Sequence, residues 1–202
     1  METGIERNQL QTRVTEGKFE YILAVLPGTE VAELVMGEKQ AFYDKYKEKA
    51  AIKETPYITI ASFTAKEEME DTIIRWMHRI ISTQPSFTAA LNNYGGFPPH
   101  SIYLRVQPEE AFRLLAKQME VVSQYISDNG CPPMFLTSRP HMNLAKRISE
   151  DVYEKAIMDY AHRSFHAAFE VAQLVLLRYD EQGVPKQVNI FNMQPALQMQ
   201  VD

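Results

Sequence analysis

The strongest constraint on the fold is a short pattern that occurs twice, once in each half of the chain. The first copy is PYITIA at residues 56–61, and the second is PHMNLA at residues 140–145. Each copy reads proline, ring, apolar residue, small polar residue, aliphatic residue, alanine. Side chains alternate between the two faces of a strand, so the ring and the small polar residue share one face. The pattern therefore predicts two strands that begin at proline and have an apolar underside and a polar pair above it.

The rest of the sequence predicts elements in the order β-α-β-α-β-β-α-β-α-β-β. Predicted strands cover 19–26, the two motif copies, 86–94, 101–106, 169–180 and 186–191, with helices between them and a single helix over 108–126. Gly95-Gly96 is predicted to form a turn. Met69, Ile73, Trp76 and Ile80 recur at helical spacing and predict one buried helix face.

The unit β-α-β-α-β recurs along the chain, with a polar-faced strand in each copy. We therefore predict an α+β fold with two lobes made by internal duplication. In each lobe we expect an antiparallel or mixed sheet that faces a central cleft, with helices outside. Residues 1–17 are predicted to be a flexible arm, 18–194 a single two-lobed domain and 195–202 a loose tail.

Composition excludes several classes of protein. The net charge of −5 provides no long-range attraction for nucleic acid, although a local basic cleft remains compatible with it. No run of 18 apolar residues is present, so we predict no membrane span, and the N-terminus lacks a secretory apolar core. The single cysteine, Cys131, excludes an internal disulfide. A cytoplasmic protein is expected.

The motif strands resemble those of the 2H phosphoesterase superfamily, which includes the 2'-5' RNA ligase-like and cyclic phosphodiesterase proteins. The family pattern is a repeated Pro-His-x-Thr/Ser-aliphatic sequence. The resemblance extends over about residues 19–191, and the opening strand at 19–27 and the YGGF sequence at 94–97 support it. It implies the two-lobed fold described above and a phosphodiester ligand in the cleft.

This chain departs from the family pattern at two positions. It retains His141 and Thr59, but Tyr57 stands at the first histidine position and Asn143 at the second hydroxyl position. The family reaction uses one imidazole as a base and the other as an acid, and histidine suits both roles because its pKa is about 6.5. Tyrosine, with a pKa of about 10, is a poor base. Loss of one such group typically costs about 10²- to 10⁴-fold in rate.

The resemblance implies a ligand site, which we expect to bind phosphate with neutral donors and nearby positive charge. Its predicted residues are Tyr57, Thr59, His141, Asn143, Tyr103 and Lys146. We interpret the chain as a 2'-5' RNA ligase-like protein that binds a phosphorylated nucleotide or RNA end with weak or no turnover. The alternative is an active 2',3'-cyclic nucleotide phosphodiesterase or 2'-5' RNA ligase-type enzyme with His141 as its catalytic residue, assisted by Tyr57 or by His100.

Several of these residues also have an ordinary structural interpretation. Tyr and Thr are common in strands, and a histidine can start a strand without any role in binding. The basic residues Lys146, Arg105 and Arg178 would suit either a cleft or a solvated surface. His162 and His166 have a spacing that suits a metal on a helix, but no third ligand is evident. We therefore predict no metal and no cofactor.

Overall fold

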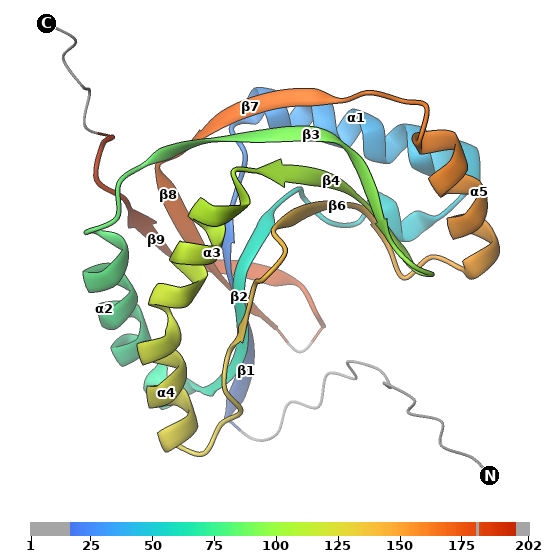
Figure 1. Cartoon of the computed structure of the whole chain (residues 1–202). Helices are drawn as coiled ribbons and strands as arrows, with labels where there is room; N and C mark the ends of the chain where they lie inside the picture. Colours follow the sequence, from blue (N-terminus) through green and yellow to red (C-terminus); the bar gives the residue numbers. More distant parts are fainter. Residues whose placement is uncertain (1–16, 181, 197–202) are drawn as a thin grey trace, which may run out of the picture.

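The computed structural model describes residues 17–180 and 182–196 (Figure 1). The strands are β1 (Lys18–Val25), β2 (Ile58–Lys66), β3 (Phe87–Phe97), β4 (Ser101–Gln107), β5 (Phe135–Leu136), β6 (His141–Lys146), β7 (His166–Val171), β8 (Gln173–Tyr179) and β9 (Pro185–Asn192). The α-helices are α1 (Thr29–Tyr46), α2 (Glu70–Ile81), α3 (Glu109–Gln118), α4 (Glu120–Asp128) and α5 (Glu150–Tyr160). Two short 3₁₀ helices are η1 (Lys49–Ala51) and η2 (Glu67–Met69).

All nine strands belong to one curved sheet, which has the order β7-β3-β4-β6-β2-β1-β8-β9, with β5 beside β2 (Figure 1). Every pairing between these strands is antiparallel. The α+β class is therefore confirmed, but the expectation of separate sheets is wrong. Because strand pairing continues across the middle, the fold is a single curled sheet.

The sheet nevertheless has two halves. The first half-sheet contains β1, β2, β5, β8 and β9, and the second contains β3, β4, β6 and β7. They join where Ile58 of β2 pairs with Met142 of β6. The predicted strand at 169–180 is in fact divided at Ala172, because β7 pairs with β3 whereas β8 pairs with β1. One apolar stretch of sequence thus supplies the edge strand β7 to the second half-sheet and the inner strand β8 to the first.

The helices cross between the halves and cover one face of the sheet. Helix α1, which connects β1 to β2, packs on β6 and β7 of the other half. In the same way α3 packs on β2, although it follows β4, while α2 packs on β9 and α5 on β3 and β4. The apolar residues of helices and strands form one core cluster. Because each half is covered partly by a connection from the other, the two halves share one core.

Both motif strands contain a β-bulge at the same position. Leu23 and Ala24 of β1 pair with Ala61 and Thr59, so Ile60 has no partner in the register. The corresponding shift in β6 leaves out Leu144. A bulge places two consecutive residues on one side and bends the strand. This explains why each motif ends in an aliphatic residue followed by alanine, all of which are buried.

Gly95 and Gly96 do not form the predicted turn, because β3 continues through them to Phe97. A Cβ atom on Gly95 would lie 2.7 Å from the ring of Tyr103, and one on Gly96 would lie 2.5 Å from the hydroxyl of Tyr153. The two glycines therefore admit an aromatic ring on each face of the strand.

The first strand, β1, begins at Lys18, and the predicted domain bounds remain predictions. The predicted arm at 1–17 lies outside the described residues except for Gly17. Of the predicted tail at 195–202, only Pro195 and Ala196 are described, and the amide of Ala196 donates to the Ser86 hydroxyl at 3.0 Å. In the described part of the chain, no helix is long and apolar enough to cross a membrane.

Candidate functional site

The two motif strands bring their polar residues to the same face of the sheet. Ile58 and Met142 are paired and both point into the buried core. The residues on either side of them therefore point to the opposite face, which we call the open face. These flanking residues are Tyr57, Thr59, His141 and Asn143, and all four are partly exposed. The structure thus brings together four of the six predicted ligand residues.

His141 is held in one orientation by its own strand and by two aromatic rings. Its Nδ1 atom lies 2.7 Å from the carbonyl oxygen of Arg139. The carbonyl can only accept, so Nδ1 carries the proton and Nε2 keeps a free lone pair. The rings of Phe97 and Tyr103 lie 4.9 Å and 5.2 Å away between centroids. Burial lowers the pKa of His141, and the charge of Lys146 lowers it further, against the opposing effect of the Arg139 carbonyl.

Tyr57 is a weaker acid in the folded protein than a phenol is in water. Its hydroxyl lies 3.5 Å from the hydroxyl of Tyr179 on β8. Burial raises the pKa of Tyr57 well above its usual value, and the contact with Tyr179 raises it further. At neutral pH the phenol is therefore fully protonated. It can donate or share a hydrogen bond, but it is a very weak base.

Tyr103 also belongs to the open face. It pairs with Asn143 across β4 and β6, and its ring stacks on Phe97 with 4.4 Å between centroids. Gly95 leaves the space that this ring occupies. Phe97 was not predicted as a site residue, and only its place in the YGGF sequence could have indicated it.

The nearest basic residues differ in whether they are already paired. Lys146 forms an ion pair with Glu54 at 2.7 Å, and Arg178 is 3.0 Å from Glu70 and 3.6 Å from Glu67. Arg105 is exposed, pairs with His141 across β4 and β6, and takes part in none of the ion pairs found among the described residues. Arg105 therefore carries a positive charge on a strand beside His141 that none of these carboxylates neutralises, while the charge of Lys146 is the one that acts on the pKa of His141.

His100 lies just before the start of β4, whereas His141 pairs near the other end of that strand. The Nδ1 atom of His100 is 3.2 Å from the carbonyl oxygen of Ile148, in the turn after β6. His100 is five residues before Arg105, the register partner of His141, which corresponds to about 16 Å of extended chain. This position does not favour His100 as the second proton-transfer group beside His141.

A hollow of about 440 Å³ adjoins the motif pair on the first half-sheet. We call it the β2 hollow, and among the residues that line it are Tyr57, Ser62, Thr64, Phe135, Lys146 and Tyr179. Its volume falls in the range of about 300–1,000 Å³ that is typical of small-molecule sites. Two predicted ligand residues, Tyr57 and Lys146, therefore border a space that could hold part of a ligand.

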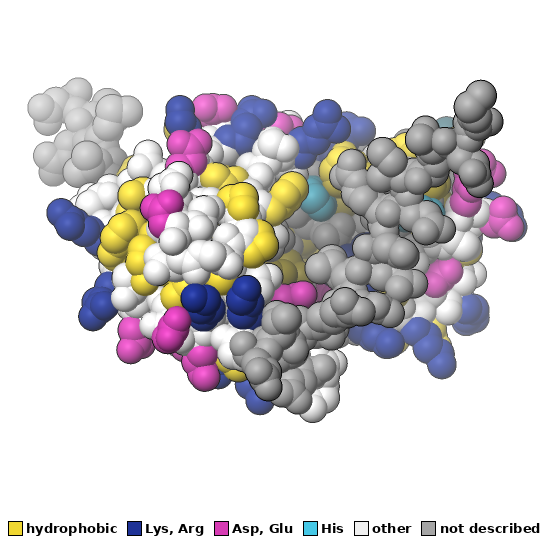
Figure 2. Space-filling view, turned by 90° about the horizontal axis from the view of Figure 1, so that it is seen from below, with side chains coloured by type: hydrophobic (Ala, Val, Ile, Leu, Met, Phe, Trp, Pro, Cys, Tyr) yellow, Lys and Arg dark blue, Asp and Glu magenta, His cyan; other side chains and the backbone are white. Residues whose placement is uncertain are grey.

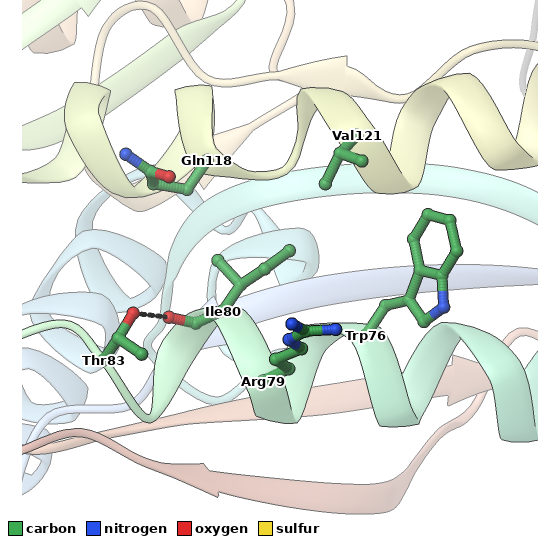
Figure 3. A pocket seen from close by; sticks show the side chains of 6 residues that line it. All are labelled: Trp76, Arg79, Ile80, Thr83, Gln118 and Val121. Atoms are coloured by element: carbon green, nitrogen blue, oxygen red, sulfur yellow. Dashed lines mark hydrogen bonds between the residues drawn. The ribbon is translucent and has the colours of Figure 1, made fainter.

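A second hollow lies between α2 and the α3–α4 pair (Figure 3). The helix predicted over 108–126 is interrupted at Met119, which lies between α3 and α4. Trp76 and Ile80 point toward Val121 across this hollow (Figure 3), and Trp76 is exposed. The expectation that Trp76 belongs to the buried stripe is therefore wrong. Met69 and Ile73 are buried as predicted, Ile80 is partly buried against the core, and α2 also buries Met77 and Ile81. This hollow shares no residue with the predicted site.

The surface charge on the face seen from below is mixed. In the view from below, Lys and Arg side chains alternate with Asp and Glu among the coloured residues, and they do not gather into one basic stripe (Figure 2). The described residues contain no cluster of three or more His, Cys, Asp or Glu side chains arranged to hold a metal ion. Binding of a phosphate would therefore depend on local donors and not on a broad electrostatic field.

Comparisons with known proteins agree with this architecture. The sequence matches the 2'-5' RNA ligase superfamily over residues 28–183. A search against curated proteins by sequence found no match. Among solved structures, the Thermus thermophilus protein TT0787 is similar with a TM-score of 0.65 and 18% identity, over 87% of this chain and 98% of that one.

Escherichia coli LigT in complex with 3'-AMP is also similar, with a TM-score of 0.61 and 20% identity over 87% of this chain and 98% of LigT. LigT in complex with phosphate has a TM-score of 0.57 and 16% identity, over 88% of this chain and 99% of LigT. At these identities the structures establish a shared fold. With most of its length matched by the family and its motif strands joined at the centre of a LigT-like curled sheet, the chain belongs to the 2'-5' RNA ligase superfamily.

Proposed function

We propose that the open face around His141 binds the phosphate of a phosphorylated nucleotide or RNA end, with weak or no turnover. The observation that carries this proposal is the pairing of Ile58 with Met142, which sets Tyr57 and His141 on the same face. A family site with histidine at both positions would have two groups that titrate near neutral pH. Here one of the two is a phenol whose pKa is raised by burial.

The chemical roles follow from what each group can donate. The protonated phenol of Tyr57, the hydroxyl of Thr59 and the amide of Asn143 are neutral donors that suit phosphoryl oxygens. Arg105 adds positive charge, and guanidinium groups bind phosphate well. His141 presents Nε2, which can accept a proton from an attacking oxygen. No second imidazole is placed on the same pair of strands to protonate the leaving oxygen, so binding is favoured over turnover.

The repeat of the motif supports the proposal that the two strands form one site. Each copy of the motif has the same bulge position, and each carries its polar pair on the open face. Two strands with a common origin would keep equivalent positions for the two sides of a phosphate. LigT, a structural relative, has been crystallised with 3'-AMP and with phosphate, which is the class of ligand proposed here.

Binding and turnover should be measured separately. We expect phosphate and 2',3'-cyclic AMP to shift the imidazole NMR signals of His141, and we expect hydrolysis of the cyclic nucleotide to be slow or undetectable. His141→Ala should weaken binding, whereas the matched control His162→Ala, at an exposed position after α5, should not. Absence of any ligand-induced shift at His141 would overturn the proposal. Rapid turnover that His141→Ala abolishes would instead identify the chain as an enzyme.

A further inference from the structure

Phe135 is an unusually exposed aromatic residue for a strand position. Its relative exposure is 68%, the highest among the exposed large hydrophobic residues of the described chain. Phe135 pairs with Ser62 of β2 and both border the β2 hollow, so its ring stands on the same open face. Aromatic side chains in the wall of a hollow that also has polar groups are typical of small-molecule sites.

The strand that carries Phe135 is firmly attached. The amide of Met134 donates to the Ser123 hydroxyl at 2.9 Å, and the amide of Thr137 donates to the carbonyl oxygen of Ile60 at 3.0 Å. The side chains of Met134 and Thr137, on either side of β5, are buried. The exposure of Phe135 is therefore not the result of a loose loop, and the ring is presented in a fixed position before any ligand binds.

The space available for a ligand extends in one direction from the phosphate site. Toward the second half-sheet, the stacked rings of Phe97 and Tyr103 already lie against His141. Toward the first half-sheet lies the β2 hollow, which Tyr57 and Phe135 both border. Ser62, the partner of Phe135, is three residues beyond Thr59 on β2, and this corresponds to about 10 Å along the strand.

We propose that Phe135 is a stacking platform for a nucleobase of the RNA end whose phosphate binds beside His141, which rests on the function proposed above. Every base presents a π-face, so an exposed aromatic ring can bind RNA without selecting a particular sequence. The hydroxyls of Ser62 and Thr64 on the same wall provide hydrogen-bonding groups for base or sugar edges. The site would therefore recognise a phosphate together with a base, and it would discriminate against inorganic phosphate.

The test compares ligands with and without a base. The probes are inorganic phosphate, ribose 5-phosphate and the 3'-phosphorylated dinucleotide ApAp, titrated by calorimetry into the full chain. Phe135→Ala and Phe135→Leu should weaken binding of ApAp by roughly 5- to 150-fold, the usual effect of losing a stacked base. Phe135→Trp should retain it, because indole also stacks. Neither base-free ligand should change in affinity in any of the three variants.

The matched control is Met158→Ala, which truncates a similarly exposed apolar residue, at 66%, on α5. It should leave all three affinities unchanged. Unaltered ApAp binding in Phe135→Ala, or an equal loss for phosphate and ApAp, would overturn the stacking platform while leaving the phosphate site intact. Failure of the unmodified protein to bind any of the three ligands would overturn the proposed function itself and the platform with it.

Discussion

Ile58 of β2 and Met142 of β6 form the residue pair through which the two half-sheets become one sheet. Both side chains are fully buried. The pair lies at the second residue after the proline of each motif copy, so the polar residues on either side of it face one another across the junction. The buried contacts beneath the junction and the polar face above it thus belong to the same two short strands.

Truncation at this junction should be costly. Ile58→Ala removes buried methyl groups where the surrounding strands cannot collapse easily, and we expect it to lower the free energy of unfolding by about 2–5 kcal/mol. The milder Ile58→Val should cost about 0.5–1.5 kcal/mol. Urea denaturation of the two variants beside the unmodified protein measures both. Equal stability of Ile58→Ala and the unmodified protein would mean that the junction does not hold the halves together.

A methyl group at Gly95 should disturb Tyr103. The added Cβ would lie 2.7 Å from the Tyr103 ring, which cannot move freely between Phe97 and His141. We expect Gly95→Ala to destabilise the fold by about 1–3 kcal/mol, as overpacking does. In a Tyr103→Ala background the same change should cost much less, which a double-mutant cycle by urea denaturation would detect. Costs that simply add would show that the two residues do not contact one another.

Tyr57→His tests whether one missing imidazole limits turnover. The substituted ring would start beside Thr59 on the open face, so no backbone change is required. We expect hydrolysis of 2',3'-cyclic AMP to rise about ten-fold or more, which corresponds to about 1.4 kcal/mol of barrier. The gain should disappear when His141→Ala is added, because the acid and the base act as a unit. A folded Tyr57→His variant that binds without any gain would mean that Asn143 or the cleft also limits the reaction.

Anion binding should become stronger as pH falls. Burial holds the pKa of His141 below its ordinary value, so the imidazole is neutral at pH 7 and becomes a cation only in acid. Sulfate, whose charge does not change in this range, should therefore bind more tightly as pH decreases from 7 through the folded-state pKa. His141→Gln should remove this pH dependence. Sulfate titrations by NMR between pH 5 and pH 7.5 would measure it, and a flat profile in the unmodified protein would contradict the role of His141.

The free energy of unfolding should rise in mild alkali, because the buried amine of Lys39 loses its charge there. This side chain on α1 is buried, and Nζ donates to the carbonyl oxygen of Ala51 at 3.1 Å. Burial lowers the pKa of Lys39 to about 8, with Glu54 opposing the change and Lys146 adding to it. The folded state therefore releases this proton before the unfolded chain does. The contribution of Lys39 to the unfolding free energy should increase by up to about 3 kcal/mol between pH 8 and about pH 10.4, the pKa of a lysine in the unfolded chain.

The control for this prediction is Lys39→Met, which retains the apolar stem and removes the amine. Several tyrosines have raised pKa values, and they destabilise the fold as pH approaches 10. Their effect cancels when the two proteins are compared at each pH. The stability of the unmodified protein relative to Lys39→Met should rise from pH 7 to pH 9.5. A difference that stays constant would show that Lys39 titrates normally.

Local sequence was sufficient to predict the two motif strands, their polar faces and most of the order of helices and strands. Alternation between strand faces depends only on residue spacing, so Tyr57, Thr59, His141 and Asn143 could be assigned to polar faces before any contact was known. That they bind a ligand remains a prediction. The repeated aliphatic-alanine ending was visible in the sequence as well, but its meaning as a bulge depends on the partner strand.

The pairing of distant strands could be seen only in the folded molecule. Residues 169–180 look like one strand because both parts are apolar and extended, yet the chain divides at Ala172 to serve two different neighbours. Gly95 and Gly96 have the composition of a turn, but the rings of Tyr103 and Tyr153 require them inside β3. The exposed position of Phe135 on the open face depends on its pairing with Ser62, which lies 73 residues away in the sequence. Residue spacing determines which side chains share a face of a strand. Long-range pairing and close packing determine which other residues, or which open surface, lie against that face.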